Sequence, residues 1–229
     1  MEAFSKFPKT PHLLWLSSVP ARNDKVMTFL EAKEFLSGTV VVEEKVDGAN
    51  LGLSFDNQGT LKMQNRGNFL SGSFTGQWER LRGWLAGHEF LLRKHLPSSA
   101  ILFGEWCYAQ HSIAYTLLPD WFLGFDVFDV DQECFWSTDK RDELLAEIGL
   151  VSVHRVASGR FTFSDVQAML FEPSAYYCGP VEGIYLRREN EWGLERRAKL
   201  VRAEFVQAIE EHWSNLPLRA NQVTVPRPA

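Results

Sequence analysis

Apolar and polar positions alternate along much of the chain in short runs that end at turn residues. Period-two alternation of β-branched and aromatic residues is typical of strands, and apolar spacings of three and four are typical of amphipathic helices. This pattern predicts strands over 39–45, 51–55, 60–65, 100–106, 121–130, 151–156, 181–188 and 193–201. It predicts helices over 28–36, 78–92, 138–148 and 202–213, with capping boxes at Thr28–Glu31 and Ser164–Gln167.

The order of these elements mixes hairpins with helices. Turn residues at 56–59 join one pair of strands, and 189–191 join the last pair. Because strands and helices do not alternate strictly, the order predicts an α+β fold with antiparallel sheets rather than a doubly wound parallel sheet. Only 30 residues follow Lys199, which are too few for a second domain.

Both ends of the chain lack a clear periodic pattern. Residues 1–27 contain Pro8, Pro11 and Pro20 and are predicted to be irregular, anchored by an apolar cluster over 13–15 (Leu13, Leu14 and Trp15). At the other end, the stretch 223–229 is predicted to be loose.

Composition narrows the class of protein. Hydrophobic residues make up 45% and charged residues 23%, which excludes wholesale disorder and a collagen-like chain. The formal net charge of −5 excludes a uniformly basic coat for nucleic acid. The six Lys and Arg residues within 187–202 stand against three Glu residues, so this stretch with net charge +3 is predicted to be a local polyanion-binding patch.

Cysteine usage and hydropathy point to one compartment. The three cysteines, Cys107, Cys134 and Cys178, form no CxxC pair, which argues against zinc ligation and a disulfide scaffold. No run approaches 18 apolar residues, and the N-terminus lacks the apolar region of a signal peptide. We therefore expect a cytoplasmic protein without membrane association.

The residues at 45–50, Lys-Val-Asp-Gly-Ala-Asn, form a candidate chemical motif at the end of an apolar strand. Strand alternation puts Glu43 and Lys45 on one side and Glu44 on the other. Gly48 permits a tight turn directly after the lysine. A lysine among carboxylates is commonly a surface ion pair, so the motif alone leaves both interpretations open.

Further candidates lie at or near strand ends. Glu105 follows an apolar run where a buried carboxylate is costly, and Glu182 also adjoins a glycine. Phe125 lies inside an apolar strand, where an aromatic residue is commonly part of the core. Period two places Arg197 and Lys199 on one side of a strand, which also suits a solvated edge strand guarded by charge.

Six short motifs follow one another in a fixed order. They are KVDGAN at 45–50, NRG at 65–67, FGEW at 103–106, FLGFDV at 122–127, VEGIYLR at 181–187 and RAKLVR at 197–202. The series resembles that of the covalent nucleotidyltransferases, the superfamily of ATP-dependent DNA and RNA ligases and mRNA capping enzymes. The asparagine of the first motif, HSIAY at 111–115 and KLVRAEF at 199–205 resemble the RNA ligase family most. The resemblance extends from about Pro11 to Trp213.

The resemblance implies a fold, a domain plan and a reaction. The fold is an ATP-grasp-like nucleotidyltransferase domain with antiparallel sheets, flanking helices and the nucleotide pocket between them. Its plan is an N-terminal extension over 1–37, an adenylyltransferase domain over 38–213 and a loose tail over 214–229, with no room for a C-terminal OB domain. The reaction joins RNA 5′-phosphate and 3′-OH ends, using ATP and Mg²⁺ or Mn²⁺, in RNA repair or processing.

The resemblance also implies roles for individual residues. Lys45 attacks the α-phosphorus of ATP and forms lysyl-AMP, while Lys199 and Arg197 neutralise the α-phosphate. Three residues are implied to contact the nucleotide or RNA: Arg66 through a ribose or an RNA phosphate, Phe125 by stacking on the adenine, and Glu43 or Glu44 by selecting the base. Glu182 is implied to bind the metal, and Glu105 to contact the ribose hydroxyls or a metal-bound water. Asp126 is implied to order the site or the 3′-OH end, and Asp47 and Asn50 to contact the nucleotide.

The chemistry of Lys45 depends on the balance of nearby charges. A free lysine has a pKa of about 10.4, so burial, cations and a bound metal are needed to favour the neutral amine. The neighbouring carboxylates favour the charged ammonium and so raise the pKa of Lys45.

Three other functions stay open on the sequence alone. They are a minimal DNA ligase, a capping-type enzyme that uses GTP, and a catalytically silent RNA- or nucleotide-binding module of the same fold. The phage type-2 RNA ligases carry lysine where this chain has Arg197, so this chain departs from their pattern at the α-phosphate contact.

Overall fold

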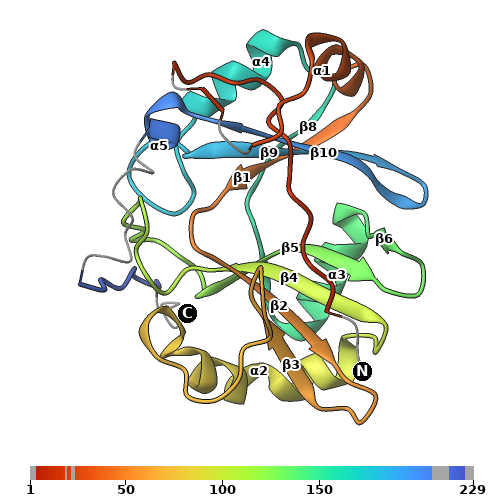
Figure 1. Ribbon diagram of the computed structural model, residues 1–229, viewed down its shortest axis with the longest axis vertical. Coiled ribbons are helices and arrows are strands. Elements are labelled where there is room, and N and C mark those ends of the chain that lie inside the picture. The colour runs from red at the N-terminus through yellow and green to blue at the C-terminus, as the bar shows by residue number, and fades with distance from the viewer. Residues whose placement is uncertain (1–3, 19, 22–23, 208–216, 225–229) are drawn as a thin grey trace, which may run out of the picture.

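Two β-sheets lie one above the other, and helices cover their outer faces (Figure 1). The computed structural model describes residues 4–18, 20–21, 24–207 and 217–224. Neighbouring strands are antiparallel except for one short parallel pair between β5 and β7. The arrangement confirms the predicted α+β fold with antiparallel sheets.

The first sheet has the strand order β10-β9-β1-β8. Its strands are β1 (Val40–Lys45), β8 (Arg155–Gly159), β9 (Gly183–Asn190) and β10 (Gly193–Val201). The outer face of this sheet packs against α1 (Phe29–Phe35), α4 (Phe163–Ala168) and the short 3-10 helix η2 (Met169–Phe171). Val40 and Val42 of β1 are fully buried in this core. Strand alternation therefore turns Glu43 and Lys45 toward the other sheet.

The second sheet has the order β3-β2-β4-β5-β6, and β7 pairs with β5. Its strands are β2 (Ala49–Phe55), β3 (Leu61–Gln64), β4 (Ala100–Trp106), β5 (Phe122–Asp129), β6 (Cys134–Phe135) and β7 (Val151–Ser152). Its outer face packs against α2 (Leu81–His95), which follows the 3-10 helix η1 (Gly76–Trp78), and against α3 (Thr138–Ile148). Each leucine buried in this core contributes about 1.5–3 kcal/mol.

The predicted strand over 151–156 is wrong in one respect. The chain forms β7 in the second sheet, crosses at 153–154, and forms β8 in the first sheet. The crossing is held where the backbone N–H of Glu44 donates to the carbonyl of His154 at 2.8 Å. The single stretch 151–156, with valines at 151, 153 and 156, thus contributes residues to a strand in each sheet, which a period-two pattern does not reveal.

Helix boundaries also differ from those expected. The second capping box lies at Thr162 and Asp165 rather than at Ser164–Gln167, because the Thr162 hydroxyl accepts from the Asp165 N–H. The helix predicted from Trp78 begins at Leu81. The last helix, α5, spans Ala203–Gln207, and the rest of its predicted length to 213 lies outside the described residues.

Both terminal segments lie against the core. Pro11 accepts from the Lys199 N–H through its carbonyl at 2.9 Å, so the N-terminal segment runs along the edge strand β10. The segment 217–224 lies against the connection between β4 and β5, where the Asn221 side chain is 5% exposed. Over 217–224 this differs from the loose tail expected from 214 and from 223 onward, because backbone groups of this segment find partners in that connection. The rest of the expected tail lies outside the described residues.

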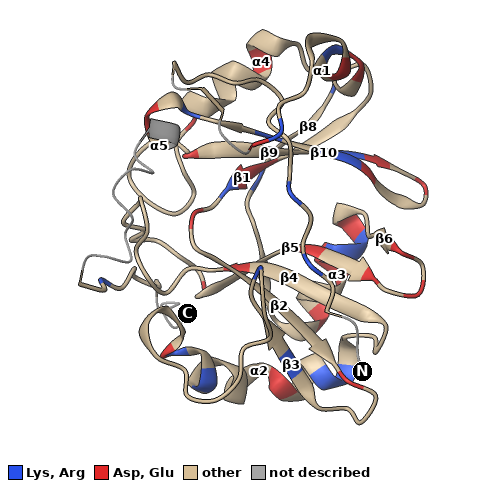
Figure 2. Cartoon of the chain, in the orientation of Figure 1, with Lys and Arg blue, Asp and Glu red and all other residues tan. Residues whose placement is uncertain are grey.

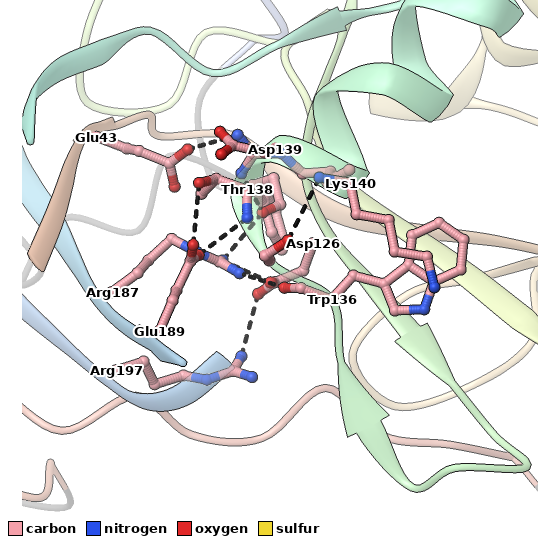
Figure 3. A network of polar contacts seen from close by, with 12 residues as sticks. Glu43, Asp126, Trp136, Thr138, Asp139, Lys140, Arg187, Glu189 and Arg197 are labelled. Carbon is pink, nitrogen blue, oxygen red and sulfur yellow. Dashed lines mark hydrogen bonds and ion pairs between the residues drawn. The ribbon is translucent and has the colours of Figure 1, made fainter. Parts of the chain in front are cut away.

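A buried ion-pair network joins the two sheets (Figure 3). Asp126 on β5 accepts from Arg187 on β9 at 2.5 Å and from Arg197 on β10 at 3.1 Å. In the same network, Arg141 on α3 donates to Glu43 on β1 at 2.6 Å. Burial lowers the pKa of Arg187, but the charges of Asp126 and Glu43 and the hydrogen bond to Glu189 act together against it, so the net shift of this pKa is upward. The Arg187 guanidinium is therefore a charged and paired group in the interior.

Removal of one partner from this network is expected to destabilise the fold strongly. Arg141→Met leaves the Glu43 carboxylate buried without its cation, which costs about 3–5 kcal/mol. Chemical denaturation measures this loss. Arg155→Ala is the matched control, because Arg155 pairs with Asp139 and Asp142 at the surface and its loss costs about 0–1 kcal/mol. Equal losses in the two variants would contradict a structural role for the buried pair.

Candidate active site

A cavity of about 540 Å³ opens between the two sheets. It lies where β1 and β10 of the first sheet face β2 and β4 of the second. Seven residues singled out in the sequence line it together: Lys45, Asp47, Asn50, Arg66, Glu105, Glu182 and Lys199. The cavity thus gathers residues from five of the six sequence motifs, although they are up to 154 positions apart in the chain.

The closest polar contact in the cavity joins Lys45 and Glu182. Lys45 ends β1 and Glu182 directly precedes β9, and their strands are paired so that Lys45 lies opposite Gly183. The Lys45 ammonium donates to Glu182 Oε1 at 2.5 Å. Burial lowers the pKa of Lys45, but the charges of Glu182 and Asp47 outweigh burial, so the pKa lies above its ordinary value. Lys45 is therefore held as an ammonium when these carboxylates are its only ionic neighbours.

The turn after Lys45 is packed tightly against β4. A Cβ atom on Gly48 would lie 2.7 Å from the carbonyl oxygen of Trp106, so only glycine fits here. Its N–H donates to Glu105 Oε1 at 3.0 Å. Burial raises the pKa of Glu105 to about 7, although Lys45 and Arg66 lower it. This carboxyl group changes its charge near neutral pH.

Lys199 lies across the cavity and is held by the N-terminal segment. Its ammonium donates to Asp24 Oδ1 at 3.0 Å, and His12 Nε2 lies 3.7 Å from the same oxygen. Burial lowers the pKa of Lys199, although Asp24 raises it. Burial and the charge of Lys199 lower the pKa of His12 to about 4, so its imidazole is neutral at pH 7.

The cavity presents oxygen atoms that suit a divalent cation. Glu182 Oε2 and Asn50 Oδ1 are buried and have no hydrogen-bond partner. In the part of the chain that the structure describes, no cluster of three or more His, Cys, Asp or Glu residues forms a complete metal cage. Mg²⁺ commonly binds through one or two carboxylates together with substrate phosphates and water. The residues fit a cation that arrives with a phosphorylated substrate.

Glu43 and Glu44 do not line the cavity. Glu43 points toward the second sheet as expected from alternation, but it is 1% exposed and paired with Arg141. Glu44 points the other way, where its carboxylate accepts from the Ser174 hydroxyl and from the Ala175 N–H. Their predicted role in base selection finds no support in this geometry.

The structure also places Phe125, Asp126 and Arg197 outside the cavity. The Phe125 ring is covered by Phe7 of the N-terminal segment, with ring centroids 5.2 Å apart. Asp126 and Arg197 belong to the buried network, and the Arg197 guanidinium also lies 3.9 Å from the centre of the Phe135 ring. The expectation of adenine stacking by Phe125 and phosphate contact by Arg197 is therefore not supported by this arrangement.

The basic stretch 187–202 does not form an open patch. Positive and negative positions are interspersed along β9 and β10 (Figure 2). Each of the six cations has a carboxylate partner: Arg187 with Asp126, Arg188 with Glu195, Arg196 with Glu34, Arg197 with Asp126, Lys199 with Asp24 and Arg202 with Glu204. A count of charges within one segment misses most of these partners, because all of them except Glu195 lie outside the segment.

The cavity also contains residues that the sequence did not single out. They are His12, Trp15, Asp24, Gln77, Trp78, His111, Ser112 and Phe205. His111 and Ser112 lie within the HSIAY motif, so the sequence marked their position but assigned them no function. The N-terminal residues His12 and Asp24 lie in a stretch without periodicity, and no local pattern marks them.

The fold and the cavity define a class of protein. Two facing antiparallel sheets, with a lysine–carboxylate pair in the cavity between them, are consistent with the covalent nucleotidyltransferase fold. The model of the RNA ligase family matches residues 38–201. The chain belongs to the RNA ligase family.

Solved structures share the fold of this chain. An RNA ligase variant from Naegleria gruberi without ligand matches with a TM-score of 0.67 at 14% identity, over 91% of this chain and 58% of that one. A second variant, with ATP and Mn, matches with a TM-score of 0.64 at 17% identity, over 89% and 58%. The same ligase with PPi matches with a TM-score of 0.59 at 19% identity, over 78% and 54%.

The likeness to these ligases covers only part of their length. The present chain spans less than two thirds of each of the Naegleria ligase chains. No curated protein was found to match the sequence. Among the described residues, no helix is both long and apolar enough to cross a membrane.

The ion pair with Glu182 is expected to control the protonation of Lys45. In Glu182→Gln the counter-charge is lost and burial dominates, so the pKa of Lys45 should fall below its value in the unmodified protein. The pH dependence of Lys45 modification by an amine-reactive reagent, read by peptide mass spectrometry, measures this shift. Lys62, which pairs with Asp56 at the surface, is the internal control in both proteins. An unchanged Lys45 midpoint would contradict the assigned pairing.

Phe125→Ala distinguishes packing from base stacking. Because Phe7 covers the ring, the substitution should destabilise the fold by about 3 kcal/mol and leave ATP affinity unchanged. Calorimetric titration with ATP and thermal unfolding measure the two effects. Phe128→Ala, on the same strand and against Phe135, is the control for packing loss. A selective rise in the Kd for ATP would restore the stacking role, since such a contact is worth about 1–3 kcal/mol.

Proposed function

We propose that this chain is the catalytic part of an ATP-dependent RNA ligase that seals RNA 5′-phosphate and 3′-OH ends. The observation that carries the proposal is the placement of Lys45 in the cavity, 2.5 Å from Glu182 and facing the side that holds Lys199. The matched family and the Naegleria ligase with ATP and Mn support ATP as the substrate.

In the first proposed step, Lys45 Nζ attacks the α-phosphorus of ATP. The N–P bond forms as the bond to pyrophosphate breaks, and Lys45 carries AMP through a phosphoramidate. Lys45 loses a proton before the attack, and Glu182 Oε1 is the nearest acceptor. Glu182 and Asn50 would hold a divalent cation such as Mg²⁺ or Mn²⁺, with Glu105 in the same cavity, and the cation would supply positive charge that offsets the carboxylates around the lysine.

Lys199 is the cation placed to stabilise the α-phosphate. Charge builds on the phosphate oxygens as the lysine attacks, and a positioned ammonium stabilises that charge. Lys199 pairs with Asp24 at 3.0 Å, so phosphate binding exchanges one anionic partner for another. Asp24 keeps the ammonium in the cavity until the nucleotide arrives.

In the second and third proposed steps, RNA takes part. The RNA 5′-phosphate attacks the AMP phosphorus and releases Lys45, and the RNA 3′-OH then attacks the activated 5′ end and releases AMP. Arg66 is exposed at the edge of the cavity, where a guanidinium suits a ribose hydroxyl or an RNA phosphate. This chemistry suits the repair or processing of broken RNA, and we place it in the cytoplasm.

The covalent step predicts a mass change that depends on Lys45. Incubation with ATP and a divalent cation should add the mass of one AMP, and Lys45→Ala should abolish the adduct because the nucleophile is gone. Intact-mass spectrometry measures the product, with Lys62→Ala as a matched lysine control and GTP in parallel.

Several outcomes would contradict the proposal. A retained adduct in Lys45→Ala would refute the nucleophile, and a stronger adduct with GTP would favour a capping-type enzyme. Absence of any adduct would favour a silent binding module. Sealing of a nicked DNA duplex in preference to a matched RNA nick would favour a DNA ligase.

A further inference from the structure

The C-terminal segment 217–224 closes over the connection between β4 and β5. The backbone N–H of Gln110 donates to the carbonyl of Arg219 at 2.8 Å. In the other direction, the N–H groups of Asn221 and Gln222 donate to Tyr108 and Tyr115 carbonyls, each at 2.9 Å. These bonds hold positions 108 to 115 of the connection, which runs from 107 to 121.

The side chain of Asn221 joins the start of this connection to its middle. Its amide oxygen accepts from the Tyr115 N–H at 2.9 Å. Its amide nitrogen donates to the carbonyls of Cys107 and Ala109, at 2.8 and 3.2 Å. The side chain is buried and uses both its donor and its acceptor groups, so alanine at this position would leave three buried backbone groups unpaired.

The same connection holds the turn that follows Lys45. The Asp47 N–H donates to the hydroxyl of Tyr115 at 2.9 Å. The Asp47 carboxylate accepts from the Ser112 N–H at 2.8 Å, and His111 Nδ1 lies 3.9 Å from its other oxygen. Asp47 is therefore held on its backbone and on its side chain by one short stretch of chain.

These contacts form a continuous path from the C-terminal segment to the nucleophile. Asn221 fixes the backbone of Tyr115, Tyr115 fixes the backbone of Asp47, and Asp47 is two residues after Lys45. We propose that Asn221 is a positioning residue that orients Lys45 for attack on the α-phosphorus. This inference rests on the proposed ligase function, because it assigns Asn221 to the first step of that reaction.

A positioning role makes a prediction that a purely structural role does not. Lys45 is the nucleophile only when lysyl-AMP forms, whereas RNA that is already adenylylated is sealed without it. Loss of Asn221 should therefore slow the first step and largely spare the last. A general loss of folded protein would lower both steps together.

The experiment compares Asn221→Ala with Gln222→Ala. Gln222 is the matched neighbour, because its side chain is exposed and its bonds to the connection are made by backbone atoms. At saturating ATP, Asn221→Ala should form lysyl-AMP about ten- to a hundred-fold more slowly, with the KM for ATP nearly unchanged. Sealing of pre-adenylylated RNA should stay within about threefold of the unmodified protein, and Gln222→Ala should match that protein in both steps.

Tyr115→Phe provides a second variant on the same path. It removes the hydroxyl that accepts from Asp47 but leaves the Tyr115 N–H bond to Asn221 intact. It should slow the formation of lysyl-AMP. The double variant Asn221→Ala/Tyr115→Phe should form lysyl-AMP at about the rate of whichever single variant is slower, because both substitutions act through one path. If Asn221→Ala does not fold, the rate of lysyl-AMP formation in Tyr115→Phe tests the same path.

Hydrogen exchange of the Asp47 amide measures the positioning independently of activity. Exchange should be at least about tenfold faster in Asn221→Ala than in Gln222→Ala. Unchanged exchange with an unchanged first step, or equal losses in the first and last steps, would overturn the inference. Absence of an adduct in the unmodified protein would instead refute the ligase function, while the exchange rates would still decide whether Asn221 holds the turn.

Discussion

The Asp126–Arg187 ion pair is the contact on which the relation between the two sheets depends. Both side chains have no exposed surface, and the pair joins β5 of one sheet to β9 of the other. Two charges withdrawn from water are tolerated only when each finds partners, and here Arg197 and Glu189 complete the set. The network therefore ties the two sheets together in the interior.

Charged residues of similar type serve two purposes along this interface, and their position relative to the cavity distinguishes them. The two carboxylate oxygens of Asp126 accept from two different arginines, and this residue does not line the cavity. Glu182 lines the cavity and has one oxygen bound by Lys45 and one buried oxygen without a hydrogen-bond partner. Glu43 also has a buried oxygen without a partner but lies outside the cavity, so an orphaned oxygen alone does not mark a ligand site. An orphaned acceptor beside a cavity costs stability, which a ligand can recover on binding. Position and orphaned oxygen together assign Glu182 to the candidate site and Asp126 to the fold.

Much of the fold and the centre of the site could be predicted from the sequence, because their signals are local. Strand alternation correctly turned Lys45 inward, and the ordered motifs brought Glu105, Glu182 and Lys199 to one cavity. The ion-pair partners could not be predicted, since Glu43 and Arg141 are 98 positions apart and no periodicity links them. Asn221 was missed for a related reason: a single asparagine in a stretch without regular structure carries no pattern.

The chemistry of the cavity follows from which charge is nearest to Lys45. Glu182, Asp47 and Glu105 together outweigh burial and raise the pKa of Lys45, so these carboxylates favour the ammonium form of the proposed nucleophile. Under the proposed function, a cation bound at Glu182 would reverse that balance, because it would remove the counter-charge from the ammonium while burial still disfavours it. The contacts of the Gly48 turn to Glu105 and Tyr115 would then hold the backbone that orients the Lys45 amine.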